Sequence, residues 1–189
     1  MRPDLINDEF MGQLKEAGCQ RISLGVESGN DYIRNKVMGR QMSEERIIRA
    51  FKMAHKHGLE TNAINIIGAP GETEEMLWDT IKLNRKVKPT SSGVNIFYPY
   101  KGTKLGDHCF EKNLVNKELY ASFSAERKET VLDYPPEYRK RLTYYRENWE
   151  ILIRPFSIKK RLKGALRKTR FFKPLRTLKR QLILRWGSL

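Results

Sequence analysis

Two glycines and a proline form the most distinctive chemical feature of the sequence. The run from Asn65 to Thr73 places Gly68, Pro70 and Gly71 directly after a pair of β-branched residues. Glycine lets a backbone turn sharply and approach a ligand closely, and proline fixes one dihedral angle of the turn. In parallel α/β folds, ligands bind at such turns, where strands end. An ordinary strand-to-helix turn has the same composition, so the pattern alone leaves both interpretations open.

Polar side chains accompany this turn in three predicted strands, namely Glu27, Asn65 and Asn95. Side chains alternate across a strand, so each strand has a bulky face and a smaller or polar face. In a (β/α) barrel we expect the bulky faces to pack on helices and the other faces to line the lumen. The predicted bulky set is Ile22, Leu24, Val26, Ile64, Ile66, Val94 and Ile96, and the predicted lumen set is Ser23, Gly25, Glu27, Ala63, Asn65, Gly93 and Asn95. Buried polar groups need partners: a polar ligand would supply them, or these side chains would pair with each other or with missing strands.

Alternating helices and strands position these side chains. We expect a helix that starts at Asn7 or Asp8, a strand at 21–27, a short helix within 31–41, a helix from Ser43 to Gly58, a strand at 61–67, a helix at 73–87 and a strand at 92–98. The repeat of roughly 35 residues from strand to strand is typical of βα units. The sequence therefore predicts an α/β fold, a partial (β/α) barrel of about three βα units with parallel strands.

Five motifs occur in an order that resembles one enzyme family. They are Ala17-Gly18-Cys19, Gly25-Val26-Glu27-Ser28-Gly29, Arg40, Gly68-Ala69-Pro70-Gly71-Glu72-Thr73 and Pro99-Tyr100-Lys101-Gly102-Thr103. Together they resemble the second half of the catalytic barrel of radical S-adenosylmethionine (radical SAM) enzymes, over roughly residues 2–114. The most similar branch is the one often preceded by a cobalamin-binding domain.

The resemblance implies a partial (β/α)6 barrel that binds a [4Fe-4S] cluster and S-adenosylmethionine and generates a 5′-deoxyadenosyl radical. It implies that Glu27 reaches the ribose or amino acid part of S-adenosylmethionine and that Arg40 meets its carboxylate. The 68–71 turn would lie beneath the adenosine, and the strand with Asn95 and Phe97 would border the adenine. The implied cofactor-binding residues are Glu27, Ser28, Arg40, Asn65, Gly68, Pro70, Gly71, Asn95 and Phe97.

The sequence departs from the family at the cluster-binding loop. It has no C-x-x-x-C-x-x-C motif, and Cys19 and Cys109 match neither a cluster ligand nor any metal-ligand spacing. Lys101 is a smaller departure, since proline is usual there. We therefore expect part of a longer, split or truncated enzyme, inactive alone, whose cluster needs cysteines from another barrel half or polypeptide, with cobalamin a candidate cofactor of the full-length enzyme. The alternative is a non-catalytic basic adaptor that retains a barrel remnant and binds an anionic membrane or an acidic partner.

The remaining chain divides into a small mixed region at 115–153 and a basic amphipathic tail at 154–189, after the barrel part at 1–114. In the mixed region, Tyr138, Leu142, Tyr145 and Trp149 form a helical stripe that predicts core packing.

The tail carries almost all of the net charge. It contains 13 Lys and Arg and no acid, so that of the net charge of +15 only 15 − 13 = +2 falls on residues 1–153. A solvated extension, a helix on an anionic membrane and a nucleic-acid contact are three interpretations. The regular apolar face favours the membrane over nucleic acid, with Lys179, Arg180, Arg185 and Trp186 as contacts. With no signal peptide and no apolar span, we expect a cytoplasmic protein whose tail lies at the inner membrane face.

Overall fold

The computed structural model describes residues 1–121 and 127–154 of the 189-residue chain. Met1–Ile153 form one compact unit. The elements, in order, are η1 (Pro3–Leu5), α1 (Asp8–Glu16), β1 (Arg21–Glu27), η2 (Tyr32–Val37), α2 (Glu44–Lys56), β2 (Glu60–Ile67), α3 (Glu74–Val87), β3 (Ser91–Ile96), α4 (Lys104–Glu111), α5 (Lys117–Ala121), α6 (Pro136–Glu147) and α7 (Trp149–Ile153). The predicted basic tail, apart from Arg154, lies outside the described residues.

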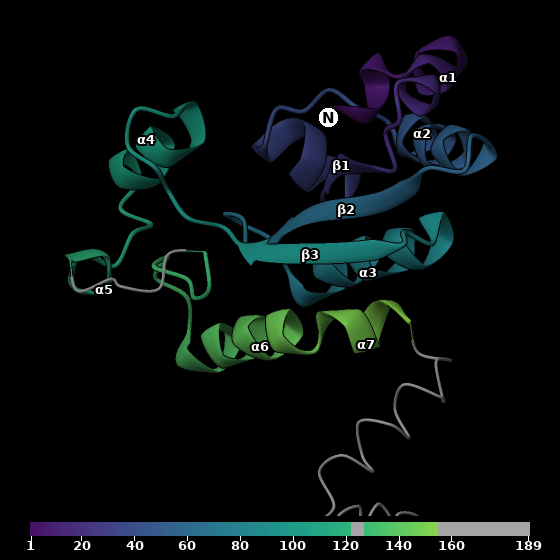
Figure 1. Ribbon diagram of the computed structural model, residues 1–189. Coiled ribbons are helices and arrows are strands. Elements are labelled where there is room, and N and C mark those ends of the chain that lie inside the picture. The colour runs from purple at the N-terminus through teal and green to yellow at the C-terminus, as the bar shows by residue number, and fades with distance from the viewer. Residues whose placement is uncertain (122–126, 155–189) are drawn as a thin grey trace, which may run out of the picture. The chain divides into compact units, whose positions relative to one another are not determined.

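The three strands form one parallel sheet in the order β1-β2-β3 (Figure 1). Leu24 lies opposite Ala63, and Ile64 lies opposite Gly93. Because the strands are parallel, their carboxyl ends meet at one edge of the sheet, where α/β proteins bind ligands. The predicted α/β fold and partial barrel are confirmed.

Side-chain caps explain where the main helices begin. Asn7, Ser43 and Thr73 each accept a hydrogen bond from the backbone N–H three residues further on. Such caps satisfy donors that a helix leaves unpaired in its first turn. The predicted starts of these three helices are therefore confirmed.

Some predicted boundaries differ from the observed ones. The short helix expected within 31–41 is the π-helical segment η2, and β3 ends at Ile96 rather than Tyr98. The helix that the stripe from Tyr138 to Trp149 predicts divides at Asn148 into α6 and α7. The difference matters most for η2, because a π-helix places its side chains differently from an α-helix.

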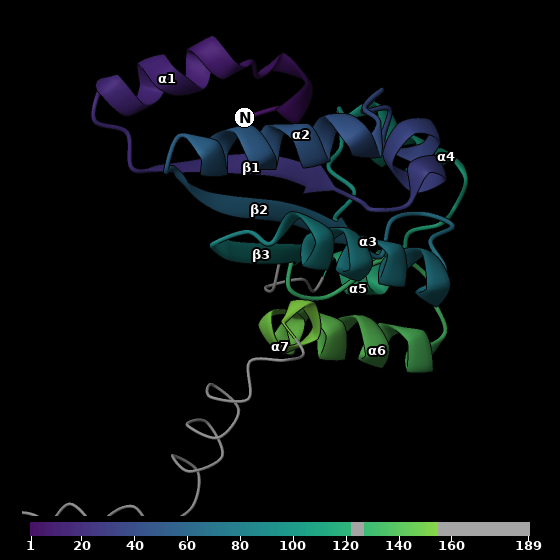
Figure 2. The same cartoon turned by 90° about the vertical axis from the view of Figure 1, so that its right-hand side faces the viewer.

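Two apolar clusters surround the sheet. One lies between β1, β2 and the helices α1 and α2, with Met11, Leu24 and Phe51 nearly inaccessible to solvent. The other joins α3 and β3 to α6 and α7, which run together beside β3 (Figure 2). The aromatic stripe predicted on the last helix belongs to this second cluster, as expected, and consists of Tyr138, Leu142, Tyr145 and Trp149.

The predicted assignment of strand faces is correct for β1 and β3 but wrong for β2. Ala63 and Asn65 of β2 are fully buried, whereas Ile64 is 37% exposed. The register explains the exchange, because Ile64 lies between Gly25 of β1 and Gly93 of β3. The bulky side chain of Ile64 therefore occupies the open face, beside the glycines of both neighbours, and the smaller side chains of β2 face the helices.

Candidate functional site

An oppositely charged pair lies at the carboxyl end of β1. The Glu27 carboxylate is 3.2 Å from Nη2 of Arg40, which follows η2. Glu27 has a φ of 63° beside a β-bulge, and its side chain folds back over Gly25. A Cβ on Gly25 would lie 2.6 Å from Glu27 Oε1, so the carboxylate can occupy this position only next to a glycine.

The pair combines partial burial with access to solvent. The side chains of Glu27 and Arg40 are 14% and 38% exposed. Burial raises the pKa of Glu27, while the positive charges of Arg40 and Arg2 oppose the rise. Arg2 also donates a hydrogen bond of 2.9 Å to the Arg40 carbonyl. Within the described residues, Nε of Arg40 is buried and has no hydrogen-bond partner. A zwitterionic ligand suits such a pair, because the carboxylate can accept from an ammonium and the guanidinium can donate to a carboxylate.

The turn after β2 lies at the same edge of the sheet. Gly68 and Gly71 have φ angles of 74° and 75°, which residues other than glycine rarely adopt. The Glu72 carboxylate folds back into the turn and accepts a hydrogen bond from the Gly68 N–H. Burial raises the pKa of Glu72 to about 7, although the backbone N–H groups of the turn oppose the rise. The turn is therefore held from inside by a carboxyl group.

Residues from far along the chain hold this turn from outside. The hydroxyl of Tyr134 donates to the Ala69 carbonyl at 2.6 Å, and that of Tyr138 donates to the Glu72 carbonyl at 2.9 Å. Leu142 of α6 packs so closely that a Cβ on Gly68 would lie 2.9 Å from its Cδ1. The helical stripe in the sequence predicts only core packing, and no local signal indicates that tyrosine hydroxyls more than 60 residues away fix the turn.

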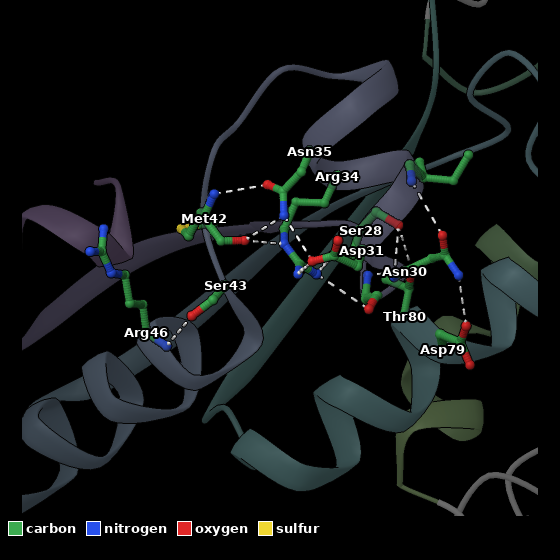
Figure 3. Close-up of polar contacts among 12 residues, drawn as sticks. Ser28, Asn30, Asp31, Arg34, Asn35, Met42, Ser43, Arg46, Asp79 and Thr80 are labelled. Atoms are coloured by element: carbon green, nitrogen blue, oxygen red, sulfur yellow. Dashed lines mark hydrogen bonds and ion pairs between the residues drawn. The ribbon is translucent and has the colours of Figure 1, made fainter.

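Two predicted cofactor-binding residues do not reach the open face. Ser28 is fully buried, and its hydroxyl lies 3.3 Å from that of Thr80 on α3 (Figure 3). Asn65 is also fully buried; its amide accepts from Asn84 of α3 at 2.7 Å and donates to the Gly93 carbonyl at 2.9 Å. The prediction that Asn65 shares a face with Glu27 is wrong, because β2 turns that side chain toward α3.

The other predicted residues remain at the carboxyl edge. Asn95 is half-buried on the open face of β3, between the buried Val94 and Ile96. The Phe97 N–H donates to the Ile67 carbonyl at 2.8 Å, and its ring packs against the apolar cluster around Cys109. Glu27, Arg40, the 68–71 turn and Asn95 are thus the predicted residues that the fold brings to one edge.

The two cysteines do not fit an iron–sulfur cluster. Cys19 precedes β1 and donates a weak hydrogen bond to the Arg21 carbonyl, and Cys109 is fully buried in α4. Burial raises the pKa of the Cys109 thiol to about 11, which disfavours the thiolate that iron requires. In residues 1–121 and 127–154, no three metal-ligating side chains come together. The same residues contain no helix with the length and apolarity of a membrane span.

Comparisons with known proteins agree with this architecture. The family model of the Radical SAM superfamily matches residues 1–83. An uncharacterized methyltransferase, PH0819 of Pyrococcus horikoshii, is 32% identical over 114 residues, which are 60% of this chain and 25% of that protein. A tRNA-2-methylthio-N(6)-dimethylallyladenosine synthase of Finegoldia magna is 28% identical over 80% of this chain and 32% of its own length. The similarity to the Radical SAM superfamily therefore lies in residues 1–83.

Solved structures share the fold. The coproporphyrinogen III oxidase HemN of Escherichia coli, a radical SAM enzyme, superposes with a TM-score of 0.58 at 20% identity, over 80% of this chain and 30% of HemN. The radical SAM methyltransferase TsrM of Kitasatospora setae, in a structure with tryptophan and a SAM analogue bound, gives a TM-score of 0.51 at 22% identity, over 59% and 22% of the two chains. The present chain spans about a quarter to a third of the length of these relatives.

Proposed function

We propose that this chain contributes the S-adenosylmethionine- and substrate-facing strands of a radical SAM enzyme. Glu27 accepts hydrogen bonds from the ammonium of the amino acid part, and Arg40 donates to its carboxylate. The 68–71 turn supports the adenosine, and Asn95 lies at the adenine side. The observation that carries the proposal is the Glu27–Arg40 pair at the carboxyl end of β1, inside the segment that the family model matches.

The chemistry of the pair supports this cofactor. The amino acid part of S-adenosylmethionine carries one charge of each sign, and the pair offers the complementary charges. The Arg40 side chain is 38% exposed, so its guanidinium can donate to a carboxylate. The two cysteines cannot supply the thiolates of a [4Fe-4S] cluster, so we assign that cluster to residues outside this chain. With the cluster, S-adenosylmethionine would supply radical chemistry. Cobalamin is a further candidate in a full-length enzyme, since TsrM has been solved with cobalamin and a [4Fe-4S] cluster bound.

Equilibrium dialysis with S-adenosylmethionine tests the proposal on the 189-residue chain. We expect wild type to bind, and Glu27→Gln and Arg40→Met each to weaken binding by about 1–3 kcal/mol, the scale for removing one partner of a charged hydrogen bond. Binding of 5′-methylthioadenosine, which lacks the amino acid part, should change little. No binding by wild type, or equal losses for both ligands, would contradict the proposal.

The opposite end of the sheet offers a matched control. Arg21 and Glu60 form an ion pair between β1 and β2 at their amino ends, and both side chains are about half exposed. Arg21→Met and Glu60→Gln remove the same chemical groups from the same sheet, away from the carboxyl edge. Their affinity for S-adenosylmethionine should equal that of wild type. If they weaken binding as much as the Glu27 and Arg40 variants, the loss reflects the fold and not the site.

A second candidate function follows from the charge distribution. Residues 154–189 carry 13 Lys and Arg without an acid, which supports an adaptor that binds an anionic membrane surface or an acidic partner. Nucleic acid is the less favoured partner, because the tail interleaves its bases with a regular series of apolar side chains. Binding of S-adenosylmethionine favours the enzyme part. A chain that binds vesicles but not S-adenosylmethionine favours the adaptor.

A further inference from the structure

We propose that Arg34 is a positioning residue, whose buried guanidinium fixes the backbone on both sides of the Glu27–Arg40 pair and so sets the distance between the two charges. The effect of that distance on ligand binding rests on the proposed function. The effect of Arg34 on the backbone can be tested without any ligand. Arg34 lies in η2, between the two residues in sequence, and its guanidinium donates to backbone carbonyls and to Asp31.

The guanidinium of Arg34 joins two backbone segments through three carbonyls. Its Nη1 donates to the Ser28 carbonyl at 2.9 Å and to the Gly29 carbonyl at 3.3 Å, while Nε donates to the Met42 carbonyl at 2.6 Å (Figure 3). Ser28 directly follows Glu27, and Met42 comes two residues after Arg40. One rigid planar group therefore connects the strand end that carries the acid to the loop that carries the base.

A second side chain of η2 acts on the same loop. The Asn35 amide accepts from the Met42 N–H at 2.8 Å and donates to the Met42 carbonyl at 3.1 Å. Asp31 accepts from both Arg34 and Asn35, at 2.9 and 2.8 Å. Two consecutive residues of η2 thus hold the same residue of the loop, and π-helical turns occur often at functional sites.

The backbone of Arg34 also holds Arg40 directly. The Arg40 N–H donates to the Arg34 carbonyl at 3.0 Å, so the backbone of Arg40, the basic residue of the pair, is bonded directly to η2. The Arg34 side chain is only 1% exposed. Lysine cannot replace it, because a single ammonium does not reproduce the fork of guanidinium donors that reaches separate carbonyls. A buried arginine that only stabilised the fold would leave the local geometry of Arg40 unchanged once the protein is folded.

Nuclear magnetic resonance of the Arg40 side chain distinguishes these two roles. Because Arg40 Nε is buried, its N–H should exchange slowly with water in wild type, and an Arg40→Lys variant assigns the signal. In folded Arg34→Lys we expect this N–H to exchange about tenfold faster, the factor for losing one or two hydrogen bonds in the clamp. The backbone amides of 27–30 and 40–43 should shift, and those of α1 should not. Arg49→Lys, at an exposed position of α2, is the matched control and should change neither.

Asn35→Ala provides a second variant if Arg34→Lys does not fold. It removes two hydrogen bonds to Met42 without leaving a buried charge, and should accelerate the same exchange by a smaller factor. Unchanged Arg40 exchange in a folded variant would overturn the positioning role. Dialysis then links the clamp to the site: Arg34→Lys should weaken binding of S-adenosylmethionine more than that of 5′-methylthioadenosine. Wild type that binds neither ligand, with accelerated Arg40 exchange in the variants, would contradict the proposed function and still support the clamp.

Discussion

Glu72 is a carboxylic acid buried inside a turn, and burial disfavours its charged form. The residue is 3% exposed. One carboxylate oxygen accepts from the Gly68 N–H, and the other is buried with no partner in the part of the chain that the structure describes. Burial raises the pKa of Glu72 from 4.5 to about 7. The folded protein therefore binds a proton at Glu72 more tightly than the unfolded chain does.

This linkage predicts how stability depends on pH. A carboxyl group whose pKa is raised by folding stabilises the protein fully below pH 4.5 and loses that contribution as the pH rises through about 7. Glu72→Gln keeps the shape and stays neutral. We expect its free energy of unfolding, relative to wild type, to increase from pH 4.5 to pH 8 by up to about 3 kcal/mol. Urea titrations of both proteins across this range measure the difference, and a pH-independent difference would show that Glu72 is not buried in its charged form at neutral pH.

The sequence identifies some of the site residues and not others. Glu27 and Arg40 are identified through the family resemblance, and the structure brings them to 3.2 Å. Asn65 is predicted on the wrong face, because alternation tells which residues share a face but not which face meets the helices. Arg34 gives no signal as a site residue, and Glu72 lies in a motif of the resemblance without an assigned role, since a charged residue in a sequence is normally assumed to be solvated.

At the scale of elements, the packing of α3 against the end of β1 depends on Gly29. A Cβ on Gly29 would lie 2.3 Å from the Asp79 carbonyl oxygen and 2.5 Å from the Thr80 Cα. Both atoms belong to the helix backbone, which cannot yield without moving α3. The Gly29 N–H also donates to the Thr80 hydroxyl at 2.8 Å, so the close packing and this hydrogen bond both hold α3 against the end of β1.

Gly29→Ala should therefore destabilise the fold by about 2–4 kcal/mol, toward the upper end for overpacking a tight contact. Gly93→Ala is the matched control, because a Cβ there would meet no heavy atom within 4 Å and the Gly93 backbone lies outside the left-handed region. Its effect should stay within about 0.5 kcal/mol. Chemical denaturation of the two variants tests the pair, and equal losses would contradict the close approach of α3.

Most elements could be predicted because their signals are local. Caps at Asn7, Ser43 and Thr73 fix three helix starts, and the β-branched runs indicate the strands. Neither the π-helical form of η2 nor the bonds from Arg34 and Asn35 to a loop that comes later in the chain could be predicted, since nothing in the local sequence indicates them. The same holds for the tyrosines that fix the 68–71 turn.

At the scale of the whole molecule, the sheet raises the question of what covers its second face. In the described residues, Ile64 is 37% exposed on the open face, and Ile66 and Asn95 are half-buried there. Parallel sheets are normally covered on both faces. The relatives are three to four times longer than the matched region, which supports the proposal that further barrel strands or another polypeptide complete this sheet.

The tail from 154 to 189 raises a separate question, about the partner of the whole molecule. Its 13 bases would attract anionic lipid, and its apolar residues would then insert. Each base near the surface contributes about 1 kcal/mol, and salt screens this term but not the apolar one. We therefore expect that deleting all residues after Ile153 abolishes co-sedimentation with anionic vesicles. The remaining body should still give the circular dichroism spectrum of a folded protein.

Two triple variants separate the apolar and the electrostatic contributions of the tail. Replacing Leu178, Leu182 and Trp186 with Ser should weaken vesicle binding more at high salt than at low salt, because only the apolar contribution resists screening. Replacing Lys179, Arg180 and Arg185 with Ser is the matched variant and should weaken binding mainly at low salt. A tail that binds nucleic acid would hardly respond to the first variant and would lose affinity steeply with salt. If the intact chain does not bind anionic vesicles at either salt concentration, the membrane proposal is refuted.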